Sequence, residues 1–259
     1  PDNGVAAAMY AACKATVKVG DGNEITLHEQ TNYPFEETIR FTVNTPKAVS
    51  FPFYLRIPSW TEGATIFVNG KKVAANPEAG QYACINREWK DNDQVEIQLP
   101  MQLSMRTWQV NKNSVSVDYG PLTMSLKIDE DYVKKDSRAT AIGDSKWQEG
   151  ADASQWPTYE IYAKTPWNYA LVLGKNEPLK DFKVVHKEWP ADNFPFTVAS
   201  TPIEVKAIGR KVPSWVIDQY DLCSELPEMD APKGEKEEIT LIPMGAARLR
   251  VSAFPNTRE

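Results

Sequence analysis

Cysteine and histidine are scarce in this sequence, which contains three and two of them in 259 residues. Cys13, Cys84 and Cys223 are odd in number, far apart and without a CxxC pair, so they predict neither a disulfide framework nor a cysteine-built zinc site. His28 and His186 have no HExxH or GxSxG motif beside them. We therefore expect free or buried thiols, no bound metal and no cofactor on this chain.

Long apolar runs and an excess of positive charge are also missing. No run approaches the roughly 20 apolar residues of a membrane-spanning helix, so no membrane partner is expected. Lys and Arg number 29 against 35 Asp and Glu, a net charge of -6 without a basic stripe, which makes nucleic acid an unsuitable partner. The chain begins at Pro1 without a signal peptide or an initiating Met, which suggests a segment of a longer protein whose targeting signal lies elsewhere.

Short strands separated by turn residues fill the first part of the sequence. A hairpin is expected where 15–19 and 24–29 flank Gly-Asp-Gly-Asn, and another where Asn69-Gly70 follows 64–68. The stretch 37–43 alternates apolar and polar residues with a period of two, as in an antiparallel strand with one buried face. Turns every 8–12 residues favour a β-sandwich over residues 1–112.

A second unit is predicted for residues 113–259. Its expected strands are 114–119, 122–128, 159–162, 169–173, 182–185, 203–207, 238–242 and the strictly alternating 247–254. The polar stretch 129–156 is predicted to be a long loop, with room for one helical turn. No window keeps a helical period for more than about ten residues. The predicted class is therefore all-β, with two antiparallel, jelly-roll-like β-sandwich domains in tandem.

Carboxylate pairs suitable for cleaving a glycosidic bond are not evident. Such a pair must face across the bond at about 5–5.5 Å for retention or about 6.5–9.5 Å for inversion. Glu36 and Glu37 are adjacent, so on a strand they point to opposite faces. Asp91 and Asp93 belong to a turn that we expect to be solvated, as is the charged run around Glu237. We therefore predict no catalytic residue.

Tryptophan offers another kind of site, because sugar rings stack on indole faces. Of the eight tryptophans, Trp60, Trp89 and Trp167 lie at strand ends or near turns and are the candidates for carbohydrate binding. The structural alternative for each is packing in the core or at a sheet edge. The other five lie in irregular stretches, where they could pack against the surface of a partner: Trp108, Trp147, Trp156, Trp189 and Trp215.

Several phrases occur in an order that resembles a known family. They are Thr31-Asn32-Tyr33-Pro34-Phe35, Phe53-Tyr54-Leu55-Arg56-Ile57-Pro58-Ser59-Trp60, Val68-Asn69-Gly70, Ile85-Asn86-Arg87-Glu88-Trp89, Asp93 to Met101, Tyr119-Gly120-Pro121-Leu122, Pro166 to Leu171 and Leu249 to Pro255. Together they are similar to the region after the catalytic barrel in bacterial β-L-arabinofuranosidase-like enzymes, glycoside hydrolase family 127, formerly DUF1680. The resemblance covers nearly the whole chain.

This resemblance implies a parent enzyme with an (α/α)6 barrel followed by two β-sandwich domains. In that family a zinc-bound cysteine is the nucleophile, further Cys and Glu ligands hold the zinc, and a glutamate is the acid/base. An adjacent Cys-Cys pair of the barrel is expected shortly upstream of this chain. Cys13 stands alone and receives no catalytic role. A periplasmic or extracellular parent is favoured, and zinc is implied only for its barrel.

Three functional hypotheses follow. The first is a non-catalytic pair of domains that supports a bacterial glycoside hydrolase acting on plant or other complex glycans. Its partners would be the parent barrel and a second copy of itself in a homodimer. The second hypothesis is a carbohydrate-binding module that holds an oligosaccharide on exposed tryptophans. The third is a structural adhesion module that associates with itself.

Overall fold

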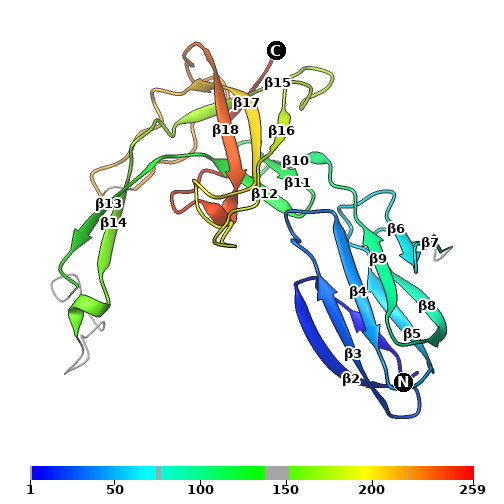
Figure 1. The fold of residues 1–259 in the computed structure, drawn as a ribbon. Helices are drawn as coiled ribbons and strands as arrows, with labels where there is room; N and C mark the ends of the chain where they lie inside the picture. Colours follow the sequence, from blue (N-terminus) through cyan, green and yellow to red (C-terminus); the bar gives the residue numbers. More distant parts are fainter. Residues whose placement is uncertain (1, 74–76, 138–151, 221) are drawn as a thin grey trace. The chain divides into compact units, whose positions relative to one another are not determined.

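The computed structural model describes residues 2–73, 77–137, 152–220 and 222–259 (Figure 1). Strands dominate these residues, and the only helical segments among them are two short 3-10 turns, η1 (Ala153–Gln155) and η2 (Met244–Ala246). The predicted all-β class with antiparallel sheets is confirmed. Within the described part of the chain, no helix is long and apolar enough to cross a membrane.

The chain folds as two compact units. The first comprises residues 1–104 and 118–122, and the second comprises 105–117 and 123–259. The sequence analysis predicted a domain boundary between residues 112 and 113. In the structure, these residues lie within the stretch 105–117, which belongs to the second unit.

The first unit is built from two sheets. Its six-stranded sheet has the order β2-β3-β4-β9-β6-β7, and its three-stranded sheet has the order β1-β5-β8. All the pairings are antiparallel except that of β1 with β5. The strands are β1 (Val5–Ala7), β2 (Cys13–Val19), β3 (Asn23–Gln30), β4 (Thr38–Asn44), β5 (Val49–Arg56), β6 (Thr65–Val68), β7 (Lys71–Lys72), β8 (Tyr82–Trp89) and β9 (Asp93–Gln98).

Both predicted hairpins are confirmed, and their turns have the backbone geometry that the sequence indicated. Gly20 and Gly22 have φ of 56° and 81°, and β2 and β3 pair in register from Val19↔Asn23 to Cys13↔Glu29. Asn69 and Gly70 also have positive φ, 50° and 74°, between β6 and β7. Glycine and asparagine tolerate this left-handed region, so these turns cost little backbone strain.

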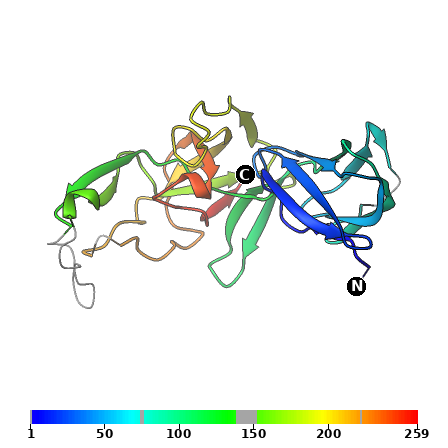
Figure 2. The same ribbon diagram turned by 60° about the horizontal axis from the view of Figure 1, so that its bottom comes forward.

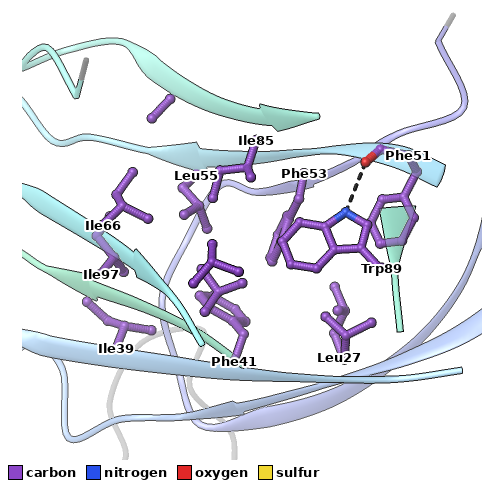
Figure 3. Close-up of a cluster of buried hydrophobic side chains, with 14 of the residues drawn as sticks. Leu27, Ile39, Phe41, Phe51, Phe53, Leu55, Ile66, Ile85, Trp89 and Ile97 are labelled. Carbon is purple, nitrogen blue, oxygen red and sulfur yellow. Dashed lines mark hydrogen bonds between the residues drawn. The ribbon is translucent and has the colours of Figure 1, made fainter. Parts of the chain in front are cut away.

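The core of the first unit lies between its two sheets and is rich in aromatic rings (Figure 3). Phe41 comes from one sheet, whereas Phe51 and Phe53 come from the other, and all three are buried. The rings of Phe41 and Phe53 pack edge to face with centroids 5.3 Å apart. Aliphatic residues of β3, β4, β6 and β9 fill the space around them, among them Leu27, Ile39, Ile66 and Ile97.

The second unit is organised around an eight-stranded sheet. Its order is β10-β11-β12-β18-β17-β15-β19, with β16 paired to β17. The strands are β10 (Leu103–Trp108), β11 (Ser114–Tyr119), β12 (Leu122–Leu126), β15 (Tyr169–Leu173), β16 (Lys183–His186), β17 (Ile203–Lys211), β18 (Lys236–Pro243) and β19 (Asn256–Arg258). Strands β11 and β15 are buried along their whole lengths.

A separate two-stranded ribbon also belongs to the second unit. Strands β13 (Glu130–Lys135) and β14 (Thr158–Ala163) pair in register from Glu130↔Ala163 to Lys135↔Thr158. Figure 1 and Figure 2 both show this ribbon extending away from the eight-stranded sheet. Most of its residues are exposed on both faces.

Strands β1, β10 and β19 were not predicted, and two of the stretches that were predicted differ in the structure. The predicted loop 129–156 contains β13 at its start and η1 near its end, while its positions 138–151 lie outside the described residues. The alternating stretch 247–254 is not a continuous strand. Its Arg248 N–H bonds the Glu130 carboxylate at 2.8 Å, and Phe254 forms an isolated bridge to Val115. Because these backbone groups have scattered partners, alternation here produces an irregular extended segment.

Candidate functional site

Trp89 is a core residue and not a sugar platform. It is 0% exposed, its indole N–H donates to the Phe51 carbonyl at 3.0 Å, and the rings of Phe51 and Phe53 lie 5.7 and 6.0 Å from it. Figure 3 shows the indole enclosed by these neighbours. A sugar needs an accessible indole face, so the expectation that Trp89 is an exposed binding residue is wrong.

Trp60 lies just after β5 and is half-buried against the core of the first unit. Its indole hydrogen-bonds the Tyr33 side chain. Tyr33 in turn packs edge to face on Tyr10, with ring centroids 5.8 Å apart. These contacts fix the Trp60 ring in place and leave part of it accessible, so carbohydrate binding by Trp60 stays a prediction.

The most unusual carboxyl of the first unit belongs to Glu29, which the sequence analysis did not select. Glu29 is 5% exposed at the end of β3, accepts the Ala11 backbone N–H at 2.9 Å, and lies 3.7 Å from the Cys13 sulfur. Burial raises the pKa of Glu29 from 4.5 to about 7, although its two hydrogen bonds oppose that rise. The sequence carried one usable signal, since Glu29 has the same parity as buried Ile25 and Leu27 on a strand that alternates.

Tyrosine side chains border this carboxyl. The Tyr10 hydroxyl donates to the Arg56 carbonyl at 2.6 Å, and burial, followed by the charge of Glu29, raises the pKa of Tyr10. Burial and the Glu29 charge also raise the pKa of the Cys13 thiol above its usual value of 9.0. The Cys13 sulfur therefore stays protonated near neutral pH and is a weak nucleophile.

A glycosidase mechanism requires two carboxylic groups with divided roles, one acid and one base or nucleophile. Among the described residues, the hydrogen-bond partners of Glu29 are a backbone amide and a thiol, which supply neither role. Glu29 is therefore best explained as a buried anchor that ties residue 11 to β3.

Carboxylates that the sequence analysis weighed have structural roles. Glu37 accepts the Met101 backbone N–H at 2.7 Å, and Asp91 accepts the Thr45 N–H at 3.1 Å. Asp93, expected in a solvated turn, is only 8% exposed and bonds Asn69 and Arg87. Burial acts to raise its pKa, but the bonds from Lys90 N–H and Asn69, with the Arg87 charge, lower it overall. These groups fasten turns and strand ends.

The implied zinc chemistry does not fit the residues of this chain. Cys13 and Cys84 lie on β2 and β8, and Cys223 lies in a loop of the second unit. Among the described residues, no three His, Cys, Asp or Glu side chains gather as metal ligands would. We therefore assign no metal-dependent step to this chain.

A buried carboxylate of the second unit is also structural. Glu204 on β17 is 7% exposed and lies 3.0, 3.3 and 3.7 Å from the amino groups of Lys127, Lys187 and Lys206. Burial disfavours its charge, but these lysines outweigh it and lower the pKa of Glu204. Three ammonium groups thus surround this carboxylate, and the cluster links β17 to residues directly after β16 and β12.

Trp167 lines a cavity of the second unit with a volume of about 640 Å³. Its ring packs edge to face on Trp215 at 5.0 Å between centroids, and Trp215 is 3% exposed. Trp215, Ile217, Ser224 and Leu226 of the loop after β17 and the segment 249–253 also line it. The sequence indicated Trp167 as a candidate but did not indicate the cavity, because the residues that line the cavity are far apart in the sequence.

Of the remaining tryptophans, Trp108 and Trp156 are 40% and 67% exposed, whereas Trp215 is buried. Trp189 donates its indole N–H to Asn193 at 2.7 Å. Trp147 lies outside the described residues. Trp215 packs inside the second unit and is not available to a partner, whereas packing of Trp108, Trp156 and Trp189 against a partner stays a prediction.

Comparison with known proteins agrees with this picture. Residues 4–101 match the family model described as β-L-arabinofuranosidase, GH127 middle domain. A solved glycoside hydrolase is 23% identical, with a TM-score of 0.62, over 99% of this chain and 36% of that chain. A GH127 β-L-arabinofuranosidase from Geobacillus stearothermophilus T6 is 21% identical, with a TM-score of 0.62, over 99% and 34% of the two chains. A further GH127 β-arabinofuranosidase is 20% identical, with a TM-score of 0.61, over 99% and 35%.

The chain thus spans about a third of the length of these solved structures, and the likeness to them shows a shared fold. The comparison with curated proteins returned no match. The fold of the chain is thus similar to that of GH127 structures, and residues 4–101 match a GH127 family model. More specifically, the resemblance to glycoside hydrolase family 127 is confirmed, and residues 4–101 correspond to its middle domain.

Proposed function

We propose that this chain is a non-catalytic accessory region of a bacterial glycoside hydrolase that acts on plant or other complex glycans. The observation that carries the proposal is the GH127 middle-domain match over 4–101 combined with coverage of about a third of the related structures. The chemistry of Glu29 and Cys13 supports it, because a thiol with a raised pKa beside a single buried carboxyl is a poor catalytic pair.

The physical role of such a region is to hold a catalytic domain in shape. Loops that carry reactive groups need rigid support, because a misplacement of about 1 Å can cost roughly a hundredfold in rate. The aromatic core of the first unit and the fully buried strands β11 and β15 of the second provide stiff interiors of the required kind.

The proposed partners are the catalytic barrel of the same protein and a second copy in a homodimer. Exposed aromatic side chains on the β13–β14 ribbon support a protein partner, because a free two-stranded ribbon is marginally stable in water. Tyr132, Tyr159 and Tyr162 are 49%, 46% and 43% exposed there.

An activity assay tests the non-catalytic role. The purified chain is incubated with aryl arabinofuranosides at several pH values, with and without added zinc. We expect the rate to equal that of a protein-free blank. Turnover well above the blank that co-purifies with the folded chain would reject the proposal.

A carbohydrate-binding module is the second candidate, and the position of Trp167 in a cavity is the observation that favours it. Titration with arabinan oligosaccharides, followed by indole fluorescence, tests this role. The module hypothesis expects saturable binding at or below millimolar concentration that Trp167→Ala abolishes. Trp60→Ala is the matched comparison in the first unit. Unchanged fluorescence at millimolar oligosaccharide would eliminate this candidate.

A further inference from the structure

The cavity beside Trp167 is formed by four segments of the second unit, one of which contributes Ile128 just after β12. Ile161 and Ala163 come from β14, Trp215 and Leu226 come from the loop after β17, and Arg250 comes from the segment after β18. Its volume of about 640 Å³ is within the range of about 300–1,000 Å³ that is typical of small-molecule sites. The cavity is therefore large enough for a ligand of one or two rings.

The floor of this cavity is held firmly before any ligand arrives. The Trp215 indole N–H donates to the Ser224 carbonyl at 3.1 Å. The Asn168 side-chain amide donates to the carbonyls of Val212 and Trp215, at 3.1 Å in each case. Because Trp215 is fixed on both sides, the edge-to-face contact with Trp167 presents a preorganised aromatic surface to the cavity.

Arg250 is the single charged side chain that lines the cavity. Its Nε–H donates to the Ala247 carbonyl at 2.9 Å, which leaves the terminal guanidinium nitrogens available. No described residue forms an ion pair with Arg250, so its positive charge is not neutralised by the part of the protein that the structure describes. The terminal nitrogens of a guanidinium bind a carboxylate with two parallel hydrogen bonds.

Carboxylates on the neighbouring elements are engaged elsewhere. Glu160 accepts the Tyr162 hydroxyl at 2.6 Å and pairs with Lys135 at 3.0 Å. Glu225 and Glu228 pair with Lys112 at 3.8 and 2.8 Å. The cavity therefore contains a cation without an acidic side chain in its lining to match it.

The remaining lining is mostly aliphatic and aromatic, with Thr165 and Ser224 among its few polar side chains. The Thr165 hydroxyl is already bonded by the Asp129 N–H, and the Ser224 hydroxyl by the Val216 N–H. A neutral sugar would bring several hydroxyls into this apolar surround, where each unmatched group costs free energy. A flat apolar body with one anionic group matches the cavity better.

We propose that the cavity binds an aromatic carboxylate, with the ring against Trp167 and the carboxylate on Arg250. Binding transfers no group and changes no covalent bond. This site is independent of the accessory role proposed above, because the inference depends only on the cavity and its charge.

Isothermal titration of the whole chain with 4-hydroxycinnamate tests the proposal. We expect a dissociation constant on the order of millimolar or tighter, as befits a small ligand. The methyl ester keeps the ring but loses the charge, so it should bind about tenfold more weakly. Arg250→Gln should weaken binding of the acid by about tenfold or more, and Arg250→Lys by less. Arg248→Gln is the matched control, because Arg248 is exposed nearby but does not line the cavity.

Several outcomes would overturn the site. Equal binding of the acid and its ester would show that Arg250 does not recognise the carboxylate. Equal effects of Arg248→Gln and Arg250→Gln would show general charge attraction. Absence of binding at several millimolar, or tighter binding of a neutral arabinan oligosaccharide than of the acid, would also reject an aromatic carboxylate as the occupant. Since none of these measurements records hydrolysis, their failure leaves the accessory role to its own assay.

Discussion

The two units contain aromatic pairs of similar geometry in opposite surroundings. Phe53 and Trp89 in the first unit pack edge to face at 6.0 Å, and Tyr132 and Tyr159 on the ribbon of the second do so at 6.1 Å. The first two side chains are 0% exposed, whereas the tyrosines are 49% and 46% exposed. Ring geometry alone contributes only about 0.5–1.5 kcal/mol beyond burial, so burial decides how much each pair stabilises its unit.

The two aromatic pairs also differ in whether their side chains are satisfied within their own unit. The Trp89 side chain satisfies its only donor within the core, so it needs nothing outside the first unit. On the ribbon, the Tyr132 hydroxyl donates to Glu130 at 2.6 Å, but the rings of Tyr132 and Tyr159 are about half exposed to water. The first arrangement is suited to rigidity, and the second is suited to contact with another surface.

Removing the buried indole of Trp89 should cause the largest loss in the free energy of unfolding. Trp89→Ala is expected to lower the free energy of unfolding by about 3–5 kcal/mol, because it leaves a cavity and an unbonded Phe51 carbonyl. Chemical denaturation followed by circular dichroism measures this change. Tyr159→Ala on the ribbon is the control. Equal losses of unfolding free energy from the two variants would show that burial does not decide how much each aromatic pair stabilises the protein.

Replacing Glu29 should cause the next largest change in the free energy of unfolding, and this change should depend on pH. Its pKa is about 7 when folded and 4.5 in the reference state, so the folded chain binds more protons between these values. Its contribution is therefore complete below about 4.5 and is lost as pH rises to about 7, a change of roughly 3 kcal/mol. Glu29→Gln should remove this decline from unfolding curves measured between pH 4 and 8. Exposed Glu24→Gln on the same strand should keep it; if both variants keep it, burial does not control this carboxyl.

Glu204 should show the opposite dependence on pH. Because its pKa is lowered, its stabilisation is present above about 4.5 and is lost as pH falls through the lower folded value. Glu204→Gln should cost about 1–3 kcal/mol at pH 7, since three ammonium groups lose their charged partner. Denaturation at pH 7 measures this cost, and exposed Glu238→Gln on β18 should be nearly neutral. No loss for Glu204→Gln would mean that the lysines are hydrated and not paired.

Replacing Tyr132 or Tyr159 on the β13–β14 ribbon should cause the smallest change in the stability of the isolated chain. Tyr132→Ala and Tyr159→Ala are each expected to cost less than about 1 kcal/mol, because half of each ring is already in water. Thermal unfolding measures these small shifts. A loss comparable to that of Trp89→Ala would show that the ribbon is part of the folding core.

Sequence reasoning succeeded where local chemistry determines structure. The Gly20 and Asn69-Gly70 turns were predictable because few residues adopt positive φ without strain. It missed β13, because Tyr132 and Val133 point to opposite faces that are both exposed, so no apolar alternation marks the strand. It also misplaced Trp89, since its partner Val49 across β5 and β8 is forty residues away in the chain.

The candidate sites were harder to predict than the strands. Parity on β3 could have indicated that Glu29 is buried, but its pKa depends on Ala11 and Cys13 and on the packing around them. The cavity at Trp167 forms only because Arg250 lies near Trp215 and Leu226, and these residues are too far apart in the sequence for a local pattern to predict their contact. Long-range packing therefore determines the sites, while local residues determine the elements.

The central claim is that these β-domains support a sugar-cleaving site without giving it a reactive group. Its most direct test is the kcat of the longer enzyme of which we propose this chain is a part, carrying Cys13→Ser together with Glu29→Gln. The account predicts a kcat on arabinofuranosides equal to that of the unaltered enzyme at a temperature where both are folded. A fall of about a hundredfold or more, the size expected for loss of a general acid or nucleophile, would contradict it.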